Sequence, residues 1–132
     1  MKMNNNPEFN QALAGIYRDG VKKFNIRTTP KVTLRKDQEN GNMTLGRTAY
    51  YDPEKLHIVL YISGRHPKDI LRSFAHELIH HVQNERGDLH LGDASDPQYA
   101  QNDEHLRDME KEAYLQGNLL MRDFEDNFKY QQ

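Results

Sequence analysis

The chain has 132 residues, of which 29% are charged, with a formal net charge of -2 at pH 7 and no cysteine. This length predicts a single domain over residues 1–132, large enough for a modest hydrophobic core. The balanced charge gives no indication of a nucleic-acid partner and excludes an acidic tail. A chain without cysteine has neither a disulfide framework nor a thiolate zinc site.

The N-terminal segment, Met1 to Asn10, is polar and carries no apolar stretch like that of a signal peptide. Nowhere does the chain contain the run of about 18 apolar residues that indicates a membrane-spanning helix. We therefore expect a cytoplasmic or otherwise intracellular protein that does not enter a membrane.

The first half of the chain predicts one helix followed by short strands. Apolar residues at helical spacing predict a packing helix from Pro7 to about Phe24. Alternation in Lys31–Lys36, a possible strand over about 44–51 and β-forming residues in Leu56–Ile62 predict three strands separated by turns. We expect an α+β domain in which a small, mainly antiparallel sheet packs against three main helices.

Residues 67–86 predict an amphipathic helix. Pro67 suits its first turn, and Gly87 provides a stop at its end. Most of its apolar residues cluster on one side, whereas His76 and His80 lie outside that stripe. The two histidines are therefore expected on a polar face of this helix.

The most informative motif lies in this helix and reads His76-Glu77-Leu78-Ile79-His80. At positions i and i+4 both imidazoles project from one face, close enough to bind the same tetrahedral metal ion. Glu77 lies about 100° round the helix, within reach of a metal-bound water. The motif predicts a zinc-dependent hydrolase and favours a peptidase; the alternative is an ordinary helix with two surface histidines and a solvated glutamate.

A catalytic zinc ion needs a third protein ligand and keeps a fourth position open for water. Residues 103–128 predict a second helix, with Glu110 in the middle of its apolar stripe and Glu112 about 160° away. A carboxylate on an apolar face needs a partner, because burying it unpaired is costly. We therefore favour Glu110 as the third ligand, with His105, His90 and Glu112 as alternatives. A structural ion pair between Glu110 and Arg72 or Arg107 is a further alternative.

Small residues in the second helix predict how closely the two helices approach. Ala113 and Gly117 follow Glu110 by about one and two turns. Gly117 would otherwise weaken the helix by about 1 kcal/mol, so a packing role explains its presence. We expect the second helix to cross the H-E-x-x-H helix at these two residues.

The H-E-x-x-H motif, followed by Glu110 and Ala113 in an E-x-x-A pattern, resembles the glutamate zincins, or gluzincins, and especially their minimal members. The resemblance covers the two helices and, loosely, the strands before them. It implies a zincin-like metallopeptidase with one catalytic Zn²⁺ ion held by His76, His80 and Glu110. It also implies Glu77 as general base and a peptide or protein as substrate.

The chain departs from this family at Tyr114, since many E-x-x-A families place Asp there to orient a zinc-bound histidine. A different residue must therefore orient that histidine here. SprT-like zincins, which use a downstream histidine as third ligand, are an alternative resemblance. Tyr99 and Tyr114 are candidate hydrogen-bond donors to an oxyanion, although tyrosines more often have a packing role.

Two further features concern the surroundings of the site. An exposed edge strand, either 55–62 or 44–50, is expected to bound the cleft and to pair with an extended substrate. His81 points about 140° away from His76 and is expected to pack or to form hydrogen bonds. A zinc amidase and a non-catalytic zinc-containing recognition module are the alternative functions.

Overall fold

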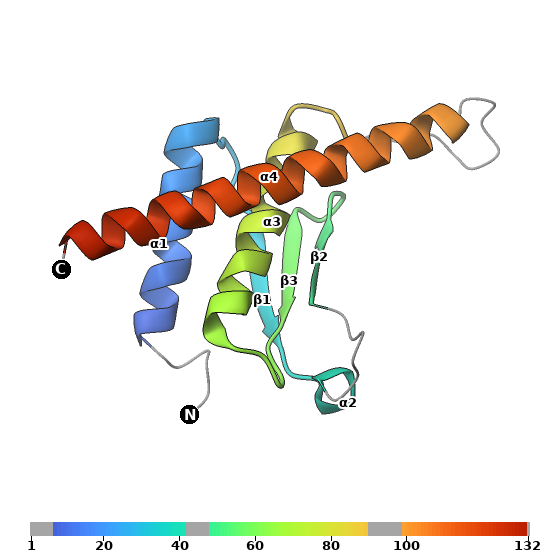
Figure 1. Ribbon diagram of the computed structural model, residues 1–132. Coiled ribbons are helices and arrows are strands. Elements are labelled where there is room, and N and C mark those ends of the chain that lie inside the picture. The colour runs from blue at the N-terminus through green and yellow to red at the C-terminus, as the bar shows by residue number, and fades with distance from the viewer. Residues whose placement is uncertain (1–6, 42–47, 90–98, 132) are drawn as a thin grey trace.

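The computed structural model describes residues 7–41, 48–89 and 99–131. Within these ranges the chain forms four helices and three strands (Figure 1). They are α1 (Pro7–Phe24), β1 (Lys31–Arg35), α2 (Gln38–Gly41), β2 (Ala49–Asp52), β3 (His57–Tyr61), α3 (Pro67–Glu85) and α4 (Tyr99–Gln131). The α+β class is confirmed, and the one-turn helix α2 replaces a segment that we expected to be a turn.

The three strands form one mixed sheet in the order β1-β3-β2. β3 pairs in parallel with β1 over five residue pairs and antiparallel with β2 over four. Our expectation of a mainly antiparallel sheet is therefore wrong. The chain leaves β1 and passes through α2 and β2 before it returns as β3, and so long a connection permits a parallel crossover.

β3 is the central strand, which its sequence explains. Ile58, Val59 and Leu60 are fully buried, as expected for a strand that is covered on both faces. The segment 55–62 is therefore not an edge of the sheet. β2 is an edge strand, and residues 42–47, which the predicted strand 44–51 includes, lie outside the described part of the chain.

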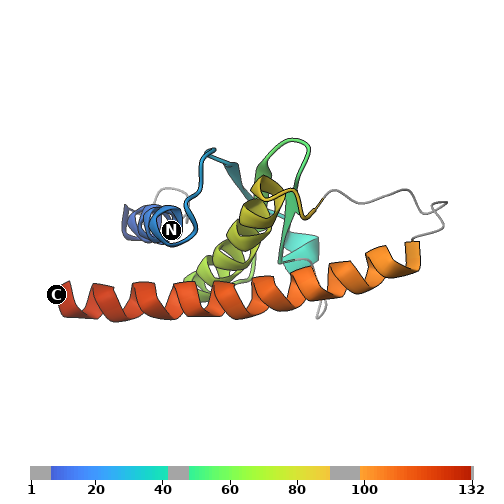
Figure 2. The same ribbon diagram turned by 90° about the horizontal axis from the view of Figure 1, so that it is seen from above.

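α3 lies between the sheet and α4, and α4 runs across α3 as one long helix (Figures 1 and 2). α1 packs against both α3 and α4. The shared core contains Ile16 of α1, Ile58 of β3, Phe74 and Leu78 of α3, and Leu120 of α4. Among the described residues, no helix combines the length and the apolar character needed to cross a membrane.

The ends of α3 agree closely with the prediction. The His66 side chain accepts a hydrogen bond from the Lys68 backbone N–H at 3.1 Å and caps the helix before Pro67. At the other end Gly87 has a φ of 84°, a left-handed conformation that favours glycine. α4 begins earlier and ends later than the expected 103–128, as its bounds show.

α3 and α4 cross at the two small residues that the sequence singled out. Ala113 is fully buried. A Cβ atom added to Gly117 would lie 3.0 Å from Cα and 3.1 Å from the backbone nitrogen of His76. The backbones therefore meet at His76, which confirms the expected close approach and places Glu110 next to the H-E-x-x-H face.

Candidate metal centre

Three side chains from two helices converge where α3 and α4 cross. The Nε2 atom of His80 lies 2.8 Å from Oε1 of Glu110, and that of His76 lies 3.2 Å from Oε2. One ligand atom from each of the three residues can be chosen so that all lie within 4.8 Å of one another. This is the only such group of histidine and acidic residues in the described part of the chain. It could hold a metal ion.

The Glu110 side chain is 62% exposed, so the reason that we gave for choosing it is only partly right. We expected an otherwise buried carboxylate that needs a partner. The crossing at Gly117 instead brings Glu110 to the rim of the site, where its carboxylate faces both imidazoles. Its place follows from helix geometry and not from the cost of burial.

Hydrogen bonds fix which nitrogen of His80 faces Glu110. The Gln83 side-chain N–H₂ donates to the Met109 carbonyl and to a Glu112 carboxylate oxygen, both at 2.8 Å. Its amide oxygen therefore faces Nδ1 of His80, also at 2.8 Å, and can only accept there. Nδ1 must carry the proton, so a neutral His80 directs the Nε2 lone pair at the carboxylate of Glu110.

A lone pair and a carboxylate oxygen 2.8 Å apart repel unless a positive charge lies between them. A proton on His80 or a metal ion bound by both groups supplies that charge. Protonating both histidines is unfavourable, because burial lowers the pKa of His76 and the charge of His80 lowers it further, although Glu110 opposes both effects. A single cation that accepts electron pairs from all three groups fits this arrangement.

Glu77 lies beside these three groups, is only 7% exposed, and takes no part in their contacts. Its Oε2 atom is the one buried side-chain N or O atom in the described residues without a hydrogen-bond partner. Burial raises the pKa of Glu77 to about 7; His80 opposes this shift and Glu110 adds to it. A buried polar atom left unpaired costs stability, and such atoms point to a functional role.

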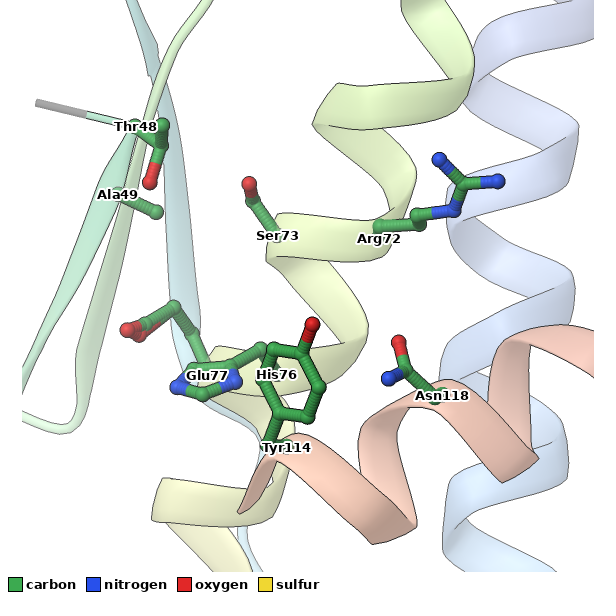
Figure 3. A pocket seen from close by; sticks show the side chains of 8 residues that line it. All are labelled: Thr48, Ala49, Arg72, Ser73, His76, Glu77, Tyr114 and Asn118. Atoms are coloured by element: carbon green, nitrogen blue, oxygen red, sulfur yellow. The ribbon is translucent and has the colours of Figure 1, made fainter. Parts of the chain in front are cut away.

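Two cavities flank the centre, and Glu77 and Ala49 line both of them. The first, about 320 Å³, is shown in Figure 3 and is lined by Thr48, Ala49, Arg72, Ser73, His76, Glu77, Tyr114 and Asn118. The second, about 400 Å³, is lined by Ala49, Tyr50, Tyr51, Pro53, Glu77, His80, Leu89, Leu106 and Glu110. Strand β2 therefore forms one wall of a cleft and α4 the other.

Tyr114 lies at the rim of the first cavity. Its ring is edge-on to His76, with the ring centroids 6.5 Å apart, and the residue is 69% exposed (Figure 3). Its hydroxyl is therefore accessible to a ligand in the cleft. Tyr99 is the first residue of α4, and its side chain lies outside the described part of the chain.

The alternative ligands lie elsewhere. His105 donates a hydrogen bond from Nε2 to the Asp88 carbonyl at 2.6 Å, near the C-terminal end of α3. Glu112 accepts hydrogen bonds from Arg86 at 2.6 and 3.1 Å, and these lower its pKa together with the hydrogen bond from Gln83, against the effect of burial. Neither residue joins the His-His-Glu group.

Two other expectations concern His90 and the arginine partner of Glu110. His90 lies outside the described residues. Arg72, the arginine closest to the H-E-x-x-H motif in sequence, pairs with Asp69 at 3.0 Å. The Glu110 carboxylate itself lies 2.8 Å from His80 and 3.2 Å from His76.

The remaining histidines have local partners. His81 is fully buried; its Nδ1 lies 2.7 Å from the Tyr51 hydroxyl and its Nε2 lies 2.8 Å from the Thr28 carbonyl. His57 contacts the Thr33 hydroxyl at 2.7 Å. The expectation that His81 packs or forms hydrogen bonds is confirmed by these contacts.

Sequence reasoning missed Gln83 and the aromatic wall of the second cavity. Gln83 stands three residues after His80, a spacing at which two helical side chains meet, and this signal was available. Tyr50 and Tyr51 carried no motif, and their place in the cleft depends on the pairing of β2 with β3.

No protein-family model, curated protein or solved structure matches the chain. The assignment of the centre therefore rests on its geometry and its donor atoms. Two imidazole nitrogens and one carboxylate form the donor set of a three-ligand zinc site with an open position. The residues present fit such an ion.

Proposed function

We propose that the chain is a zinc-dependent metallopeptidase with a zincin-like fold of the gluzincin type. The observation that carries this proposal is the combination of a His76-His80-Glu110 donor group with an unpaired buried carboxylate oxygen on Glu77. A purely structural metal site has no use for that fourth group. A hydrolytic site requires it as a proton acceptor.

A zinc ion bound there would lower the pKa of a water molecule and polarise the carbonyl of the scissile bond. Glu77 would accept a proton from that water and deliver it to the leaving amine. Tyr114, exposed at the rim, would donate a hydrogen bond to an oxygen that gains negative charge. Gln83 keeps the His80 lone pair directed at the centre.

The substrate that fits the cleft is an extended peptide. β2 is an edge strand, and it borders both cavities on either side of Glu77. Among the described residues no strand pairs with the outer edge of β2, and its N–H and C=O groups there can pair with a peptide backbone while side chains of the peptide enter the cavities. Backbone pairing of this kind supports a peptidase over a zinc amidase acting on a non-peptide substrate.

The test is digestion of a broad peptide library by the wild-type protein and by Glu77→Gln at equal zinc occupancy. The variant preserves side-chain size but removes the proton acceptor, so cleavage should fall by about 10²–10⁴-fold while zinc stays bound. Chelator treatment should abolish wild-type cleavage, and restored zinc should recover it.

Equal cleavage by both proteins would show that Glu77 is not the base. Zinc binding without cleavage of any folded, unfolded or peptide substrate would replace the peptidase by the recognition module. Release of an amide or sugar-linked group without peptide cleavage would favour the amidase.

A further inference from the structure

Two histidines of the proposed metal centre are held very differently. Nδ1 of His80 lies 2.8 Å from Oε1 of Gln83, a side chain that is fully buried. For His76 the described residues provide no hydrogen-bond partner at Nδ1, and its side chain is 27% exposed. One imidazole is therefore fixed by the protein and the other is not.

Gln83 is in turn held by α4. Its amide nitrogen donates to the Met109 carbonyl and to Glu112, and the guanidinium of Arg86 binds the same carboxylate. Because both partners of the nitrogen are acceptors, a flipped amide would place its oxygen against two other oxygens. The contacts therefore fix the amide orientation.

We infer that Gln83 is the positioning residue of the centre: held by Glu112, it keeps the His80 proton on Nδ1 and so presents the Nε2 lone pair to the metal ion. This inference rests on the proposed metal site. Partners that orient a ligating histidine in this way are usually carboxylates, backbone carbonyls or waters. A glutamine performs the task here because its amide can accept from the imidazole and donate to α4 at the same time.

The arrangement also couples metal binding to the packing of the two helices. Glu110 and Glu112 belong to the same helix, so the helix that supplies the third ligand also fixes the amide that orients His80. A shift of α4 along α3 would disturb both contacts together. The centre is thus assembled as one unit from α3 and α4.

The test compares Gln83→Leu with Asn84→Leu. Asn84 is the next residue, and its amide donates to the Tyr51 hydroxyl and the Pro53 carbonyl without contacting either histidine of the centre. Zinc affinity, measured by competition with a chromophoric chelator, should fall about 10–100-fold in Gln83→Leu. It should stay within about threefold of the wild-type value in Asn84→Leu, on the same scale of effects.

Long-range proton–nitrogen NMR spectra of the metal-free protein provide a readout that a loss of packing would not move. Wild-type His80 should carry its proton on Nδ1 when neutral, and Gln83→Leu should give a mixture of both tautomers. His76 should show the same tautomers in both proteins. Neither readout depends on hydrolysis. An inactive wild-type protein would therefore contradict the peptidase proposal, while zinc affinity and the His80 tautomer would still test the role of Gln83.

Glu112→Ala keeps the test decisive if Gln83→Leu does not fold, because this side chain is partly exposed and lies outside the core. It should weaken zinc binding about tenfold, since the Met109 carbonyl still holds one Gln83 hydrogen. Unchanged zinc affinity and an unchanged His80 tautomer in Glu112→Ala and Gln83→Leu would overturn the inference. So would an equal loss of affinity in Asn84→Leu.

Discussion

α3 carries histidine and glutamate on two different faces, and the two faces behave in opposite ways. One face presents His76, Glu77 and His80 toward the cleft and α4. The other presents His81 and Glu85 toward the segment between α1 and β1 and toward β2. By composition alone either face is a candidate site.

On the second face the polar groups are paired. Nε2 of His81 donates to the Thr28 carbonyl, so Nδ1 accepts from the Tyr51 hydroxyl. The Glu85 carboxylate accepts from the backbone N–H groups of Arg27 and Thr28 at 2.7 to 3.1 Å. Each buried donor there meets an acceptor, which is the pattern of a structural network.

On the first face, hydrogen-bond acceptors face other acceptors or have no partner. The His80 lone pair is directed at Glu110, and one oxygen of Glu77 has no partner among the described residues. This face could hold a cation among its acceptors, whereas the acceptors of the second face already meet donors of the protein. The difference between the faces lies in which polar atoms are left unsatisfied, not in residue type.

The largest expected effect is on zinc binding, which alanine substitutions on the two faces should change in opposite ways. His76→Ala, His80→Ala and Glu110→Ala should each lose stoichiometric zinc, because each removes one of three ligands. His81→Ala should retain about one zinc ion per chain at unchanged affinity. Metal analysis of the four purified variants measures this directly. Loss of zinc in a folded His81→Ala would erase the distinction between the faces.

The next effect is on stability. His81→Ala removes the acceptor of the Tyr51 hydroxyl proton and the ring N–H that donates to the Thr28 carbonyl, and should lower the free energy of unfolding by about 2–3 kcal/mol. His76→Ala in the metal-free protein should change it by less than about 1 kcal/mol, since that side chain is partly exposed. Urea denaturation followed by circular dichroism compares them. Equal losses would mean that both histidines are structural.

The close crossing of α3 and α4 brings Glu110 to the histidines of the first face, and Gly117→Ala tests this crossing. The added Cβ would meet the His76 backbone at 3.0 Å, so α4 must shift, and overpacking should cost about 1–2 kcal/mol of stability. Zinc affinity should fall about tenfold, because Glu110 moves with α4.

Gly20→Ala is the matched control for this crossing, since the atoms nearest its Cβ would be side-chain atoms of Leu78, Leu120 and Ile26 and not backbone. It should leave zinc affinity unchanged whatever its effect on stability. An exposed helical glycine changed to alanine would gain up to about 1 kcal/mol. A stabilised Gly117→Ala with full zinc affinity would therefore contradict the close crossing.

The smallest expected effect is the pH dependence of the second face. Burial raises the pKa of Glu85, but the hydrogen bonds from Thr28 and Arg27 outweigh it and hold the pKa below the ordinary 4.5. Its contribution to stability is thus present above pH 4.5 and is lost as the pH falls through the lowered value. Glu85→Gln should reduce this loss of stability in metal-free protein. An identical acid profile in both proteins would show that Glu85 is not stabilised as a carboxylate.

Local features of the fold were predictable from the sequence. The apolar spacing of α1 and α3, the early Pro67 and the final Gly87 act within one or two turns, so their consequences can be read along the chain. The strand order was not predictable in this way. The parallel pairing of β1 with β3 depends on the crossover between them, and no residue pattern encodes it.

The same division holds for the site. His76, Glu77 and His80 follow from positions on one helix. Glu110 was chosen from its place in the apolar stripe of α4, although its carboxylate is exposed, and Ala113 and Gly117 marked where the helices cross. Gln83 was missed because its orientation depends on Glu112 and the Met109 carbonyl of the other helix. Contacts between elements, unlike spacing within one, leave a weak trace in the sequence.

The central claim is that a metal ion binds between the first face of α3 and Glu110. Crystals of the zinc-loaded protein, measured on both sides of the zinc absorption edge, test it most directly. We predict one strong anomalous peak per chain, bonded to Nε2 of His76, Nε2 of His80 and a carboxylate oxygen of Glu110 at about 2.0–2.2 Å. A peak at His81, at His105 or nowhere in the chain would contradict the account.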